Sequence, residues 1–128
     1  MTSLFSNFAP VKFEGASTQN PLAYRHYNPD EMILGKSMLD HLRLAVSYWH
    51  TFCGAGADMF GSGTSLRPWH TENDAMKAAT HKAESAIDFV RLLNLPFYCF
   101  HDTDVAPEGD SLKDYIENFA HIVDILEK

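Results

Sequence analysis

Two short apolar runs, each followed by an amphipathic helical pattern, are the feature that most constrains the fold of this chain. The first run covers about residues 45–52 and the second residues 97–100, and a Gly-rich or polar loop separates each run from the next helix. Strands that alternate with helices are joined by right-handed crossovers and pair in parallel. The sequence from residue 44 onward therefore predicts an α/β fold with a parallel pair of strands.

The helix expected after the first strand has the clearest periodicity in the chain. Thr71 followed by Asp74 forms a capping pair at its start, and Asn94 with Pro96 provides a stop. A second helix is expected from Ser111. The first helix has one apolar stripe, formed by Met76, Ala79, Ala83, Ala86, Ile87, Val90 and Leu93. The stripe of the second helix consists of Tyr115, Ile116, Phe119, Ile122, Val123 and Leu126.

The amino-terminal third has a less regular pattern. Residues 1–28 carry little periodicity and are expected to form an irregular arm with one short strand at residues 11–14. Asn28 and Pro29 predict a helix start, and Gly35 is expected to interrupt that helix before the chain changes to a strand near Leu44. We therefore divide the chain into residues 1–43, an arm with a helix, and residues 44–128, two strand–helix units. Four glycines mark a long loop between the first strand and its helix, at positions 54, 56, 61 and 63.

Composition limits the classes of function. A chain of 128 residues with 45% hydrophobic residues is large enough to bury the core of one domain. Its formal net charge of −7 disfavours nucleic acid and anionic membranes as partners. We expect a cytoplasmic protein, because no apolar run reaches the roughly 18 residues of a spanning helix and the start lacks signal-peptide features. Cys53 and Cys99 are isolated, so reduced thiols are expected.

A cluster of polar side chains directly follows the second predicted strand. In parallel α/β folds the working residues lie at the carboxyl ends of the strands, which is where His101 and Asp104 occur. A histidine can transfer a proton near neutral pH, and a carboxylate bound to one ring nitrogen fixes its tautomer. The three-residue spacing permits that contact, and a solvated turn accounts for the same residues equally well. Trp49 closes the first strand at the equivalent position, where a role in the core is the commoner alternative.

Two parallel strands alone would leave both sheet edges exposed, which makes such a sheet marginally stable. The strands around Tyr48 and Phe97 are therefore expected to need further partners. The same expectation applies to the helix faces that carry Phe89, Val90, Phe119 and Ile122. We predict a homo-oligomer, with a dimer favoured.

Several ordered sequence blocks resemble the amino-terminal part of xylose isomerase, in its longer class with an amino-terminal extension. They read NPLAYRHYNPDE, YWHTF, GADMFG, RPW and PFYCFHDTDVAPEG, and the match spans nearly the whole chain. That family folds as a (β/α)8 TIM barrel, which takes roughly 250 residues. The resemblance implies a partial barrel, namely the amino-terminal arm plus the first two βα units.

The resemblance also implies an activity and roles for single residues. The family interconverts D-xylose and D-xylulose, or D-glucose and D-fructose, with two divalent cations (Mg, Mn or Co), and it assembles as tetramers of paired dimers. By resemblance, His101 helps to open the sugar ring and Asp104 orients that histidine. Trp49 forms an aromatic wall of the sugar pocket, and Phe60 reaches into the neighbouring subunit's pocket. Thr103 departs from the family, where valine is common at this position.

The family's metal ligands lie on later strands, so the resemblance assigns no metal ligand to this chain. A chain with the ring-opening pair and without the groups for the hydride shift is predicted to be inactive as an isomerase by itself. The alternative is a stand-alone sugar-binding, metal-binding or assembly module derived from xylose isomerase.

Overall fold

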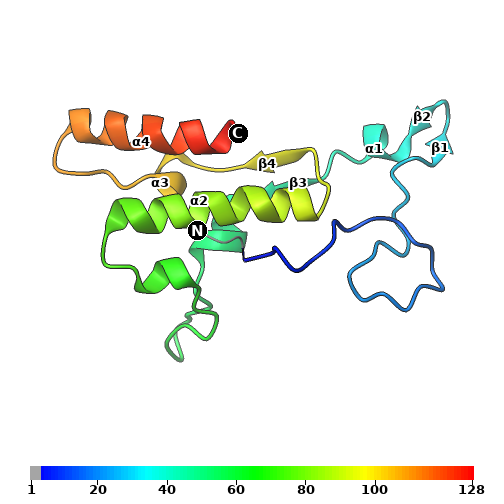
Figure 1. The fold of residues 1–128 in the computed structure, drawn as a ribbon, viewed down its shortest axis with the longest axis horizontal. Helices are drawn as coiled ribbons and strands as arrows, with labels where there is room; N and C mark the ends of the chain where they lie inside the picture. Colours follow the sequence, from blue (N-terminus) through cyan, green and yellow to red (C-terminus); the bar gives the residue numbers. More distant parts are fainter. Residues whose placement is uncertain (1–3) are drawn as a thin grey trace.

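The computed structural model describes residues 4–128 as a small α/β structure, in which two long helices pack beside a short parallel sheet (Figure 1). In chain order, the elements are β1 (Met32–Ile33), β2 (Lys36–Ser37), α1 (Met38–His41), β3 (Ala45–Ser47), the π-helix η1 (Trp49–Cys53), the 3-10 helix η2 (Pro68–Thr71), α2 (Ala75–Leu92), β4 (Phe97–Cys99), α3 (Asp102–Val105) and α4 (Leu112–Leu126). Strands β3 and β4 pair in parallel, which confirms the α/β prediction. The described residues form no closed barrel.

The core lies between α2, α4 and the segment that runs from β3 through η1. Tyr48 and Ile122 are almost fully buried there, and the indole N–H of Trp69 donates a hydrogen bond to the carbonyl oxygen of Phe52 at 2.8 Å. The hydroxyl of Tyr98 on β4 likewise donates to the carbonyl oxygen of Leu126 on α4 at 3.0 Å. The first bond joins η2 to η1 and the second joins β4 to α4, while apolar burial supplies the main stabilisation.

Helix α2 confirms the clearest of the periodic patterns, although its start differs from the prediction. The side chain of Asp74 is the N-cap and accepts hydrogen bonds from the backbone N–H groups of Met76 and Lys77, both at 3.0 Å. Thr71 instead ends the 3-10 helix η2, so the predicted Thr71–Asp74 capping pair is wrong. At the other end, Asn94 has a φ of 53°, the left-handed conformation that terminates helices. Ser111 caps α4 as predicted.

The first predicted strand is shorter than its sequence suggested. Strand β3 ends at Ser47, and residues 49–53 turn into the π-helix η1. The aromatic residues that resemble a strand pattern are used to pack this turn, because Phe52 contacts both Tyr48 (ring centroids 5.3 Å apart) and Trp69 (6.2 Å). Tertiary packing of the aromatic rings thus overrides their strand propensity.

The helix predicted from Asn28 and Pro29 is wrong. Residues 32–37 form a two-stranded antiparallel hairpin, in which Leu34 and Gly35 both have positive φ values of 49° and 82°. Two consecutive positive φ values are typical of a tight hairpin turn, which a helix cannot contain. Only residues 38–41 become helical, as α1.

The expected arm is irregular and is tied to the end of α2. The N–H of Val11 donates to the carbonyl oxygen of Leu92, and the hydroxyl of Tyr24 donates to the carbonyl oxygen of Leu93 at 2.7 Å. The predicted strand at residues 11–14 is reduced to one isolated bridge between Phe13 and Tyr24. Residues 1–3 of this arm lie outside the described residues, and the domain division after residue 43 stays a prediction.

Exposed apolar surface lies mostly away from the helix faces where it was expected. Val90 and Ile122 are buried, and Phe89 and Phe119 are partly buried against the same core, so the prediction that these faces lack a cover is wrong. Strand β4 does carry open apolar surface, because Phe97 is 42% exposed. No helix formed by residues 4–128 combines the length and apolar character needed to cross a membrane.

Candidate functional site

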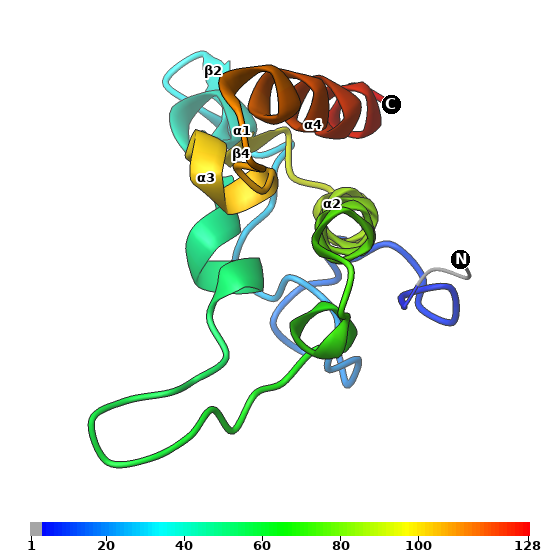
Figure 2. The ribbon, with the colours of Figure 1, turned by 90° about the vertical axis from the view of Figure 1, so that its left-hand side faces the viewer.

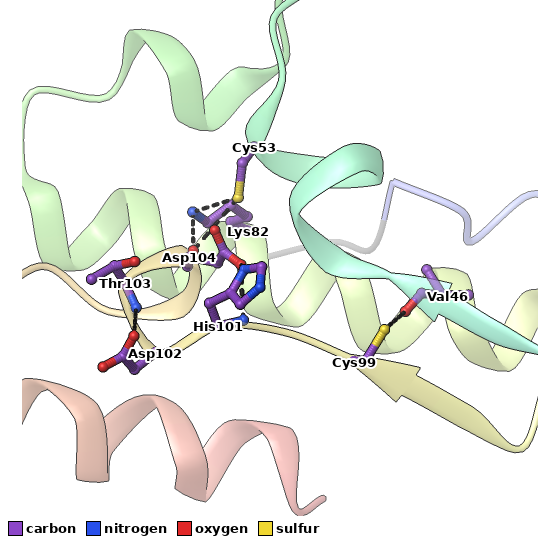
Figure 3. Close-up of polar contacts among 8 residues, drawn as sticks. All are labelled: Val46, Cys53, Lys82, Cys99, His101, Asp102, Thr103 and Asp104. Carbon is purple, nitrogen blue, oxygen red and sulfur yellow. Dashed lines mark hydrogen bonds and ion pairs between the residues drawn. The ribbon is translucent and has the colours of Figure 1, made fainter.

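His101 and Asp104 form a hydrogen-bonded pair where β4 gives way to the short helix α3 (Figure 3). Oδ2 of Asp104 accepts two hydrogen bonds from His101, one from the backbone N–H and one from ring Nδ1, both at 2.8 Å. His101 is the N-cap residue of α3 and Asp104 is the third residue of that helix. The contact that the sequence permitted is therefore formed, within a single turn of helix.

The hydrogen bond between these side chains fixes where the imidazole carries its proton. An ionised carboxylate can only accept hydrogen bonds, so with Asp104 in that form the hydrogen between the two groups is on ring Nδ1 of His101. In the neutral ring, Nε2 is then the unprotonated nitrogen. The side chain of His101 is 64% exposed and that of Asp104 only 17%, so the imidazole lies at the surface above its more buried carboxylate. This arrangement suits a histidine that takes up a proton at Nε2.

Trp49 lies against the imidazole from the neighbouring segment. It is the first residue of η1, and its ring centroid is 4.5 Å from that of His101 with 38° between the ring planes. The parallel pairing of β3 and β4 brings these two residues together, because both follow the carboxyl ends of adjacent strands. The structure thus juxtaposes Trp49, His101 and Asp104, while leaving the role of Trp49 in sugar binding a prediction.

Phe60 lies on the long Gly-rich loop, which extends away from the body of the molecule (Figure 2). Phe60 is 88% exposed, and the ring contacts of Trp49 and His101 among residues 4–128 do not include it. Asp58 orders the tip by accepting from the N–H groups of Phe60 and Gly61 at 2.8 and 3.1 Å. The loop therefore presents Phe60 to the solvent rather than to the His101–Asp104 pair of its own chain.

Gly63 lies so close to Ala55, on the opposite side of the loop, that a glycine is required there. A Cβ at Gly63 would lie only 2.6 Å from the carbonyl oxygen of Ala55, so no other residue fits without a backbone shift. Arg67 closes the base by donating from Nη1 to the carbonyl oxygens of Gly54 at 2.7 Å and Ser65 at 3.2 Å. The base of the loop is thus held by specific contacts.

The sequence analysis missed two side chains behind the pair, Lys82 and Cys53. Nζ of Lys82 donates to the carbonyl oxygen of Asp104 at 2.5 Å and lies 3.6 Å from Sγ of Cys53, which also approaches that carbonyl oxygen at 3.6 Å (Figure 3). Burial raises the pKa of the Cys53 thiol, and the neighbouring Lys82 ammonium opposes that rise. The thiol is therefore a neutral packing partner at neutral pH.

Asp102 faces another direction. Its Oδ1 accepts from the N–H of Thr103 at 2.8 Å. That bond, together with a hydrogen bond from Tyr115 on α4, lowers the pKa of the Asp102 carboxyl group. Asp102 therefore stays ionised near neutral pH, and its negative charge lies at the amino-terminal end of α3, where it is favourable.

A metal centre has no support among the described residues. Residues 4–128 contain no group of three or more His, Cys, Asp or Glu side chains placed to hold one ion. A divalent cation such as Mg²⁺ or Mn²⁺ takes about six ligands, of which Asp102 and Asp104 could supply few. The residues present do not fit a metal site, so we assign no chemical step through a metal to this chain.

Comparison with characterised proteins identifies close relatives. The chain is 58% identical over 127 residues to the xylose isomerase of Pseudoalteromonas atlantica, and 56% identical over 126 residues to those of Pectobacterium carotovorum and Yersinia enterocolitica. These matches cover 98–99% of this chain and 29% of the length of each relative. No protein-family model matches the chain. The family resemblance noted in the sequence blocks is confirmed.

Proposed function

We propose that the chain, which aligns along 98–99% of its length with xylose isomerases, corresponds to their amino-terminal portion and supplies the ring-opening pair of an aldose–ketose isomerase. The substrates proposed are D-xylose and D-glucose, which would be converted to D-xylulose and D-fructose. In this proposal the chain forms the amino-terminal arm and the first two βα units of a TIM barrel.

The observation that carries the proposal is the hydrogen bond between Nδ1 of His101 and Oδ2 of Asp104. Opening a cyclic sugar requires a proton to move between the anomeric hydroxyl and the ring oxygen. With Nδ1 held by the carboxylate, Nε2 of His101 is the nitrogen that exchanges a proton with the sugar, and Asp104 stabilises the imidazolium while it exists. Trp49, whose ring packs against the imidazole, would supply an apolar wall for the sugar carbons.

The hydride shift that follows ring opening is assigned to no residue of this chain. In the complete family enzyme, two divalent cations (Mg, Mn or Co) are proposed to polarise the sugar oxygens, and their ligands would come from outside residues 4–128. We therefore propose that the isolated 128-residue chain is inactive as an isomerase.

A chimaera tests the proposed function. The 128 residues would replace the matching residues of the Pseudoalteromonas atlantica xylose isomerase, and D-xylulose formation would be measured with Mg²⁺ or Mn²⁺ for the chimaera, the parent enzyme and the isolated chain. We expect turnover by the chimaera and the parent, with none above buffer for the isolated chain. A folded but inactive chimaera would refute the proposed function, and turnover by the isolated chain would refute its inactivity.

Calorimetric titration of the isolated chain with D-xylose and D-glucose distinguishes the proposed function from the alternative, a stand-alone sugar-binding module. Saturable heats from the isolated chain would favour that module, whereas flat titrations would count against it.

We also propose that the chain associates with itself, with a dimer favoured. The support is the apolar surface left open on β4 at Phe97 and on the loop at Met59 and Phe60, of which the last two are 89% and 88% exposed. Small-angle scattering at micromolar concentration should give the mass of a dimer. A mass equal to one chain under those conditions would rule the proposal out.

A further inference from the structure

Lys82 makes three contacts from the middle of α2, one to α3 and two to the segment that contains η1 and its N-cap. Nζ donates to the carbonyl oxygen of Asp104 at 2.5 Å, lies 3.6 Å from Sγ of Cys53 in η1, and lies 5.6 Å from the ring centroid of Tyr48, the buried residue between β3 and η1. Figure 3 shows the ammonium between Cys53 and the turn that carries Asp104. One side chain therefore joins α2, α3 and the segment that carries Trp49.

The carbonyl oxygen that Lys82 contacts needs a partner from elsewhere. Asp104 lies in the last turn of the four-residue helix α3, where backbone carbonyl groups lack an intrahelical N–H. A cation near the carboxyl end of a helix is stabilising, and a hydrogen bond from a charged donor is about twice as strong as a neutral one. The second contact to this oxygen is the thiol of Cys53, a weak donor. Lys82 is therefore the strong partner of the Asp104 backbone.

The sequence of α2 leaves Lys82 free to reach this turn. The positions three and four residues away on either side are all Ala or Ser, namely Ala78, Ala79, Ser85 and Ala86. None of them can form an ion pair with Lys82 along the helix, and their small side chains do not obstruct it. The side chain is half-buried, and its recorded partners are a carbonyl group, a sulfur and an aromatic ring. A solvated surface lysine would have none of these partners.

We propose that Lys82 is a positioning residue for the His101–Asp104 pair, because it holds the backbone of α3 where the carboxylate reaches Nδ1 of the imidazole. The catalytic meaning of this role rests on the proposed function. The contact itself does not, because it is a structural one: both hydrogen bonds that His101 donates end on the same oxygen, Oδ2 of Asp104. A shift of that turn would lengthen these bonds, and the imidazole would then no longer be held in the tautomer that carries its hydrogen on Nδ1.

The test uses the 15N-labelled 128-residue chain, without sugar, metal or turnover. Long-range 15N–1H spectra at about pH 8.5, where imidazole is neutral, give the ratio of the Nδ1–H and Nε2–H tautomers of His101. Lys82→Met keeps the apolar stem and removes the donor, and we expect the ratio to fall about three- to tenfold, the scale of one net hydrogen bond. Lys77→Met, an exposed position on the same helix, is the matched control and should leave the ratio unchanged. The His101 signals are assigned with His101→Gln.

A second measurement needs no variant, so the proposal stays testable if Lys82→Met fails to fold. In the wild-type chain, the hydrogen bond should give a scalar coupling between 15Nζ of Lys82 and the carbonyl 13C of Asp104. A folded Lys82→Met chain with an unchanged tautomer ratio, or the absence of this coupling, would overturn the proposal. Neither result depends on isomerase activity, so a failed chimaera assay and a failed positioning role are distinguishable.

Discussion

Replacing His101 by glutamine in the chimaera is expected to lower kcat for D-xylose by about 10²- to 10⁴-fold, the contribution typical of one positioned acid–base group. Glutamine can keep a hydrogen bond to Asp104, but it has no nitrogen that takes up a proton near neutral pH. Steady-state kinetics on cyclic D-xylose measures the effect. Because the loss arises in proton transfer, KM should change much less than kcat.

The control for this experiment is His121→Gln on the exposed side of α4, which removes an imidazole far along the chain from the pair. It should leave kcat unchanged. If both variants retained kcat within about threefold of the unsubstituted chimaera, His101 would have no acid–base role of the expected size, and the proposed function would lose its main support.

The second large effect concerns folding. Truncating Ile122 to alanine is expected to lower the free energy of unfolding by about 2–5 kcal/mol, because the side chain is 0% exposed at the α2–α4 contact and leaves a cavity. Domains have free energies of unfolding of about 5–15 kcal/mol, so the variant would lose a large part of its stability. Urea unfolding of the isolated chain, followed by far-ultraviolet circular dichroism and Trp fluorescence, measures the change.

Ile116→Ala is the matched control, because it makes the same substitution on the same helix at a side chain that is 58% exposed. Its effect should lie within about 0.5 kcal/mol, as for most surface substitutions. Equal losses at the two positions would show that the core is not centred between α2 and α4 in solution. Such a result would also imply that the isolated chain is loosely packed.

The helices could be predicted from sequence wherever a long periodic pattern and its end signals agreed. Helix α2 has an 18-residue pattern that ends beside Asn94, whose positive φ terminates it. Shorter patterns failed. The Asn28–Pro29 start signal was real as a local turn, since Oδ1 of Asn28 accepts from the N–H of Asp30 at 3.2 Å, but no amphipathic face followed to stabilise a helix.

The sequence could propose which residues belong to the candidate site, but it could not predict how they are arranged. Their position after a strand made His101 and Asp104 candidates, because parallel strands present their carboxyl ends at one edge. That a single turn, α3, would bring them within 2.8 Å could not be read from a spacing of three residues, since an open loop has the same spacing. For Lys82 the sequence offered one weak sign: the residues three and four positions away on α2 are all Ala or Ser, so the lysine has no ion-pair partner on its own helix.

The sequence by itself determined that this chain is α/β, where α2 and α4 lie, that β3 and β4 pair in parallel, and which family it resembles. These properties follow from local periodicity, end signals and ordered motifs, which are written along the chain. The tertiary structure alone decided that Trp49 begins a π-helix against His101, that Nδ1 of His101 meets the Asp104 carboxylate, and that Lys82 reaches Asp104. The contacts of Trp49 and Lys82 join segments far apart in sequence, whose energies no local pattern contains, and the contact of His101 depends on whether its turn becomes helical.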